Sequence, residues 1–143
     1  MKEQLITFET AKLAKEKGLQ IGVKTSYCEY HSKYVYDGDP EHPESHKKNE
    51  VRLDRDFYTV NNYKDIDLSN KHYTIYEALT QSLLQKWLRE EHNIHITITS
   101  ISQESWQYHI TKPGQRLGDN YEEDFYTYEE ALESGLHQAL KLI

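Results

Sequence analysis

Apolar residues recur at helical spacing in the middle of the chain. Within the stretch 79–91, Leu83, Leu84, Trp87 and Leu88 lie at positions i, i+1, i+4 and i+5. This spacing places them on one stripe of an amphipathic helix, while polar and charged side chains fill the other face. The stretch therefore predicts a central helix, and these four large side chains are the best candidates for its core.

Two further helices are predicted near the ends of the chain. Thr7 can cap a helix over 8–17, and Gly18 follows where a left-handed residue suits the helix end. Thr127 and Glu130 match a capping box that opens a C-terminal helix. Its apolar or small residues repeat without a slip: Tyr128, Ala131, Leu132, Gly135, Leu136, Ala139, Leu140 and Ile143. The small ones allow this helix to approach its neighbour closely.

Alternating apolar and polar residues predict strands elsewhere. The segments are 21–27, 51–57, 94–99 and 106–111. A short turn at 102–105 joins the last two into a hairpin, which Pro113 and Gly114 then break. An acidic loop is expected over 118–124, and residues 125–126 suggest a brief edge strand.

Residues 72–76 fit either a short strand or the first turn of the central helix. Thr74 and Glu77 match a capping box, which favours the helical interpretation. Thr80 offers a later start for the same helix.

These elements predict an α+β fold with a single domain over residues 1–143. We expect an antiparallel sheet of about four strands with the amphipathic helices packed on one face. A chain of 143 residues can bury a sizeable core, and 12 Tyr, 3 Phe and 2 Trp argue against disorder. The polar, turn-rich stretch 37–50 predicts a flexible loop within this domain.

Charge disfavours some partners. The net charge is −7, and residues 73–143 carry 5 Lys and Arg against 11 Asp and Glu. A surplus of acid repels phosphates, so nucleic acid is not expected as a partner. Cys28 is the sole cysteine, and no apolar run resembles a signal peptide or a membrane span, so we expect a cytoplasmic protein without a membrane partner.

Few patterns in the sequence point to catalysis. Phosphate-binding and dinucleotide-binding glycine motifs, paired-cysteine motifs and metalloprotease motifs are missing from the sequence. We therefore assign no cofactor, no metal and no catalytic residue. Some groups of side chains could bind a metal ion, but each also fits a solvated surface, so we do not assign them as sites. They are His42 with His46, Asp54 with Asp56, Asp65 with Asp67, and His92, His95 and His109.

We favour an acidic stretch as the binding surface over the tyrosine-rich segment 27–36, which could stack bases but carries few positive charges. The acidic stretch comprises Asp119, Glu122, Glu123 and Asp124, followed by Glu129, Glu130 and Glu133. Such a run either solubilises the surface or faces a basic protein partner.

Three stretches also carry a resemblance. Residues 7–18, 80–95 and 128–143 together resemble a family of short proteins of unknown function from gut bacteria and their phages or prophages. This resemblance implies no activity, cofactor or catalytic residue. We expect a small non-enzymatic interaction or accessory protein of phage or mobile-element type. The alternatives are an acidic inhibitor that mimics nucleic acid and a metal-dependent hydrolase.

Overall fold

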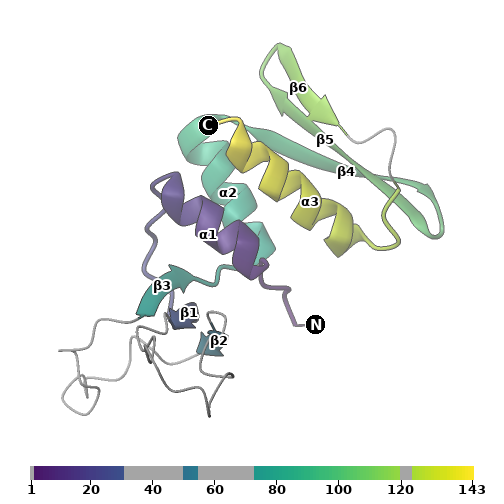
Figure 1. Ribbon diagram of the computed structural model, residues 1–143. Coiled ribbons are helices and arrows are strands. Elements are labelled where there is room, and N and C mark those ends of the chain that lie inside the picture. Colours follow the sequence, from purple (N-terminus) through teal and green to yellow (C-terminus); the bar gives the residue numbers. More distant parts are fainter. Residues whose placement is uncertain (1, 31–49, 55–72, 120–123) are drawn as a thin grey trace, which may run out of the picture. The chain divides into compact units, whose positions relative to one another are not determined.

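The computed structural model describes residues 2–30, 50–54, 73–119 and 124–143, which contain three helices and six strands (Figure 1). The predicted α+β class is confirmed. The chain divides into two compact units, one formed by residues 1–20 with 79–143 and the other by residues 21–78. The strands form two three-stranded antiparallel sheets instead of one sheet of about four. The single domain over residues 1–143 stays a prediction.

The first unit places helices on one face of a sheet, as predicted. Its elements are α1 (Phe8–Glu16), α2 (Gln81–His92), β4 (His95–Ser102), β5 (Ser105–Lys112), β6 (Gln115–Asp119) and α3 (Tyr128–Lys141). The sheet has the order β4-β5-β6. Helix α3 packs against β4 and β5, and both α1 and α2 pack against α3 (Figure 1).

The three helices begin where threonines can cap them. The hydroxyls of Thr7, Thr80 and Thr127 each accept a hydrogen bond from the backbone N–H three residues later, at 3.4, 3.3 and 3.1 Å. These bonds satisfy donors that a helix start leaves unpaired. At the other end of α2, Asn93 is left-handed with φ of 55°, and Gly18 after α1 has φ of 86°. The start of α2 thus lies at the later of the two predicted positions.

The interior of this unit lies between α2, α3 and the sheet. Leu84 and Leu88 are fully buried, while Leu83 and Trp87 are half-buried at the sides of the predicted stripe. The buried part of the C-terminal stripe consists of Ala131, Leu132, Gly135, Leu136, Ala139 and Leu140. Ile96 and Ile110 face each other across the hairpin and are both buried. The central and C-terminal helices therefore share one core with the hairpin.

Strand β6 was not predicted, because Pro113 and Gly114 were interpreted as the end of the hairpin. They form a turn instead, with Gly114 at φ of 77°, and β6 pairs with β5 beyond it. The brief edge strand at residues 125–126 is confirmed as a bridge, in which the backbones of Phe125 and Trp106 exchange hydrogen bonds of 2.9 and 3.0 Å.

The second unit contains strands β1 (Ser26–Tyr30), β2 (Glu50–Asp54) and β3 (Tyr73–Glu77), which form a sheet in the order β2-β1-β3. The helical interpretation of residues 72–76 is wrong for the part that the structure describes, because Tyr73–Glu77 is strand β3. Glu77 does not cap a helix: its carboxylate accepts hydrogen bonds from the backbone N–H groups of Ile21, Gly22 and Val23. Those residues form no strand, so the strand predicted over 21–27 begins at Ser26.

Three further features concern this unit or the whole chain. The flexible loop predicted over 37–50 lies outside the described residues, apart from Glu50, which begins β2. Cys28 is buried. Among the helices that the structure describes, we find none with the length and apolar character needed to cross a bilayer.

Candidate functional site

The first turns of α3 concentrate negative charge. Glu129, Glu130 and Glu133 follow the Thr127 cap directly. Carboxylates are favourable at a helix N-terminus because the helix dipole is positive there. Glu129 and Glu130 are exposed, whereas Glu133 is half-buried.

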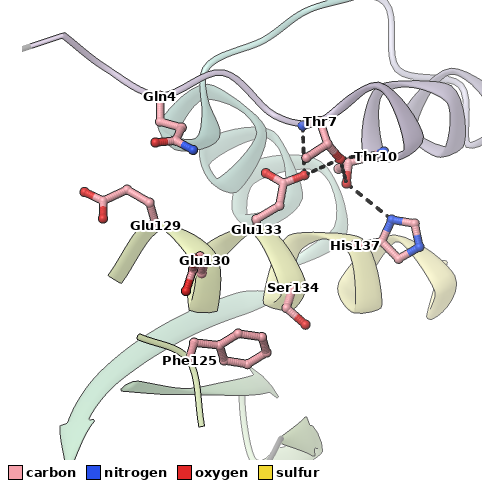
Figure 2. A pocket seen from close by; sticks show the side chains of 9 residues that line it. All are labelled: Gln4, Thr7, Thr10, Phe125, Glu129, Glu130, Glu133, Ser134 and His137. Atoms are coloured by element: carbon pink, nitrogen blue, oxygen red, sulfur yellow. Dashed lines mark hydrogen bonds between the residues drawn. The ribbon is translucent and has the colours of Figure 1, made fainter. Parts of the chain in front are cut away.

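These glutamates line an open groove of about 450 Å³ in the first unit. The groove follows α3, with the start of α1 along one side and Phe125 along the other (Figure 2). The lining residues are Gln4, Thr7, Thr10, Phe125, Glu129, Glu130, Glu133, Ser134 and His137. Three of them are acidic and none is Lys or Arg, so the groove carries a negative potential.

Glu133 joins three segments at the centre of the groove. Its Oε1 accepts hydrogen bonds from the backbone N–H of Thr7 at 2.9 Å and from the Thr7 hydroxyl at 2.8 Å. Its Oε2 accepts from the Nε2 amide of Gln81 at 3.0 Å, and Gln81 is only 3% exposed. The same amide donates to the backbone carbonyl of Glu129 at 3.0 Å. Glu133 thus holds the starts of α1 and α2 against α3.

A chain of hydroxyls continues from Glu133 towards His137 (Figure 2). The Thr10 hydroxyl lies 3.2 Å from Thr7 Oγ1 and 3.3 Å from His137 Nδ1. A hydroxyl beside an imidazole is also the arrangement of an activated nucleophile and its base. However, Thr10 is 1% exposed, so a substrate could not reach its oxygen. We therefore interpret this row of hydrogen-bonded side chains as a polar contact that docks α1 on α3.

Burial lowers the pKa of His137 below its usual value of 6.5, and the charge of Lys141 lowers it further. The carboxylates of Glu133 and Glu9 oppose this shift but do not overcome it. The neutral imidazole is therefore favoured at pH 7, and its Nδ1 can serve as donor or acceptor towards Thr10.

This shift predicts a pH dependence of stability. Because the unfolded state binds a proton at His137 more readily than the folded state, the contribution of His137 is complete above pH 6.5 and decreases as the pH falls through that value. Thermal unfolding of the wild type and of His137→Asn between about pH 7.5 and 5.5 should show a shallower decline for the variant. Carboxylates that protonate in the same range are common to both proteins. Parallel pH curves would contradict the assignment.

The other two glutamates of the lining make fewer described hydrogen bonds than Glu133. Glu130 Oε2 accepts from the backbone N–H of Tyr126 at 3.1 Å, which fixes the segment before α3. Glu129 is exposed, and only its backbone carbonyl has a described partner. An ionised carboxylate has about four acceptor positions, so both side chains can still accept bonds from a cationic group.

Aromatic side chains gather beside these acids. Tyr126 is 75% exposed, directly after Phe125 in the groove wall. The Phe125 ring lies 6.2 Å from that of Tyr108, and Trp106 makes an edge contact with Tyr128 at 5.8 Å. Rings of this kind attract cations through their negative faces.

The acidic surface predicted from the sequence is only partly described. Asp119 ends β6, and Asp124 is exposed and accepts a hydrogen bond from Gln107 Nε2 at 2.8 Å. Glu122 and Glu123 lie outside the described residues. The structure therefore brings together the second half of the predicted acidic run. Thr10 and His137 carry no signal of their own in the sequence, and Thr7 was predicted only as a helix cap.

The metal candidates gain no support from the described residues. Within residues 2–30, 50–54, 73–119 and 124–143, no group of three or more His, Cys, Asp or Glu side chains could hold an ion. Register places His109 opposite Thr97, so His95 and His109 are diagonal neighbours on one sheet face and not direct partners. The candidates at residues 42, 46, 56, 65 and 67 lie outside the described part of the chain.

Comparisons with protein-family models, with curated proteins and with solved structures gave no match.

Proposed function

We propose that this chain is a small non-enzymatic interaction protein whose groove on α3 binds a basic segment of a partner protein. The observation that carries the proposal is the lining of the groove. It gathers Glu129, Glu130 and Glu133 and includes no Lys or Arg side chain. An arginine or lysine of a partner would find carboxylate acceptors there and the Phe125 ring beside them.

The surrounding charge supports the same partner. Residues 73–143 hold most of the negative charge of the chain, with 11 acidic against 5 basic residues. A field of one sign raises the rate at which an oppositely charged partner meets the groove. If the partner is itself a nucleic-acid-binding protein, the chain acts as an acidic mimic of nucleic acid.

The resemblance to short proteins of gut bacteria and their phages supports an accessory role of phage or mobile-element type. The single cysteine and its burial suit a cytoplasmic setting.

The groove can be tested with a labelled peptide of alternating arginine and alanine. Fluorescence anisotropy should show binding that weakens with added salt, whereas a peptide with glutamine in place of arginine should not bind. Glu129→Lys should weaken binding on the order of tenfold, because it reverses one charge of the groove without removing a described side-chain bond.

Glu91→Lys is the matched control. Glu91 is exposed on α2, outside the groove, and the substitution changes net charge by the same amount. Its affinity should stay close to that of the wild type. Equal losses in both variants would show attraction by net charge alone, and the proposed groove would then be wrong. A wild type that does not distinguish the two peptides would also contradict the proposal.

A further inference from the structure

His137 is the one histidine among the described residues that line the groove on α3. The other charged side chains of this lining are Glu129, Glu130 and Glu133. Histidine is the side chain whose ordinary pKa places its change of charge between pH 5 and 8. The charge of the groove therefore depends on whether this imidazole carries a proton.

Helical spacing places His137 in line with two of the acids. Glu129, Glu133 and His137 follow one another at intervals of four residues along α3. Lys141 continues this line by one further interval, outside the lining of the groove. Side chains four residues apart are neighbours on a helix surface, with about 6 Å between their Cβ atoms. Figure 2 shows Glu129 at one end of the lining and His137 at the other, so His137 lies where the line changes from acidic to basic.

The His137 ring is half-buried and keeps a nitrogen available for a proton. Its Nδ1 lies 3.3 Å from the Thr10 hydroxyl, whereas its Nε2 makes no hydrogen bond with any residue that the structure describes. In the charged ring both nitrogens are donors, so Nδ1 can donate to the Thr10 oxygen. Protonation therefore changes the charge of the ring without removing its contact with α1.

Charged groups on two helices act on this ring. Burial and the charge of Lys141, one turn later on α3, disfavour the protonated form and lower the pKa of His137. Glu133, one turn earlier on α3, and Glu9 on α1 favour the protonated form without reversing the shift. The ring is therefore mainly neutral at pH 7.5 and takes up its proton as the pH falls below 6.5.

We propose that a proton on His137 and the basic segment of a partner compete for the groove, so that acidification releases the partner. This inference rests on the proposed function of the groove. The protonated ring places a positive charge one helical turn from Glu133, inside a lining whose other described charges are acidic. A guanidinium group bound beside Glu133 then meets a like charge, which lowers its affinity. By linkage, a bound basic segment must in turn lower the pKa of His137.

Fluorescence anisotropy with the labelled peptide of alternating arginine and alanine tests this competition. The ends of the peptide are acetylated and amidated, so that none of its groups titrates in the range used. Between pH 7.5 and 5.5 the affinity of the wild type should fall roughly fivefold, because the free groove takes up the proton more readily than the occupied one. His137→Asn should lose most of this dependence. His137→Lys carries the positive charge permanently and should bind as weakly at pH 7.5 as the wild type does at pH 5.5.

His92→Asn is the matched control. His92 lies on α2 outside the lining of the groove, and its substitution also removes one imidazole that titrates. This variant should keep the pH dependence of the wild type, since the general gain of positive charge on acidification is nearly the same. Circular dichroism of each protein at both pH values separates loss of binding from unfolding.

The pKa of His137 provides a second test, which does not require binding at low pH. An NMR titration of the imidazole protons, assigned with His137→Asn, should give a lower pKa for His137 in the wild type saturated with peptide than in the free protein. His92 should show no such change.

The outcomes distinguish the two proposals. A wild type that does not bind the arginine peptide at pH 7.5 overturns the proposed function and this inference with it. If the wild type binds but His137→Asn keeps the full pH dependence, the groove remains the binding site and the competition with a proton is wrong. The same conclusion follows if the peptide leaves the pKa of His137 unchanged.

Discussion

Replacing Leu84 with alanine is expected to lower the free energy of unfolding of the first unit by about 2–5 kcal/mol. Leu84 is 0% exposed on the face of α2 that meets the core, where Leu88 and Leu136 are equally buried. The substitution removes buried methyl and methylene groups and leaves a cavity that the surrounding side chains can only partly fill. The loss is large because the stability of a domain is itself only about 5–15 kcal/mol.

Urea unfolding followed by tryptophan fluorescence measures this loss. Both tryptophans, Trp87 and Trp106, belong to the first unit, so the signal reports on that unit even if the other unfolds separately. Leu83→Ala is the matched control, because it makes the same change at the neighbouring, half-buried position. It should lower stability by less than half as much. Equal losses at both positions would contradict the orientation assigned to α2.

The helices could be predicted well because their signals are local. Each begins at a threonine whose hydroxyl bonds to a backbone N–H three residues later, and that spacing is visible in the sequence. The same holds for the ends of α1 and α2, where Gly18 and Asn93 have positive φ. Local signals predicted the wrong element where the same segment fitted both a helix start and a strand. Thr74 and Glu77 have the spacing of a capping box, yet Glu77 binds the backbone of Ile21, Gly22 and Val23.

The arrangement of strands could be predicted only in part. Alternation predicted the β4–β5 hairpin, because its partners lie within a few residues of each other. Strand β1, in contrast, pairs with β2 and β3, and the resulting sheet is separate from that of the hairpin. Alternation identifies a strand but does not determine its partner, so two sheets could not be distinguished from one. Strand β6 contains Gly118 and two charged residues, and its sequence resembles a loop.

The candidate site, too, could be predicted from the sequence only in part. The run of glutamates at the start of α3 is visible in the sequence, and it lines the groove. The contacts of Thr7 and Thr10 with Glu133 and His137 span 126 and 127 positions. Such contacts arise from the packing of α1 on α3, which no local pattern specifies. The side of α3 that faces a partner was therefore not predictable, although the charge of that helix was.

Replacing Gly135 with valine is expected to lower the stability of the first unit by about 3 kcal/mol. A Cβ atom at this position would lie 3.0 Å from Ile96 Cγ2 and 3.2 Å from both Cβ and Cγ of Tyr108. These atoms belong to β4 and β5, so the small residues of α3 allow close contact with the sheet. A branched side chain would push the helix from the sheet or force Ile96 and Tyr108 out of their preferred rotamers. Gly135→Ala should cost less, because alanine favours the helix by about 1 kcal/mol and adds only the first carbon.

Gln138→Val separates this steric cost from the helix propensity of valine. Gln138 is exposed on the same helix, one turn later, and its side chain does not face the sheet. Its substitution should lower stability by no more than about 0.7 kcal/mol. Urea unfolding of the Gly135 and Gln138 variants, followed by tryptophan fluorescence, gives the comparison directly. If Gly135→Val were as stable as Gln138→Val, the space between α3 and strands β4 and β5 would accommodate a branched side chain. The close contact inferred from the glycine would then be wrong, and the register of α3 on the sheet would need to be reassigned.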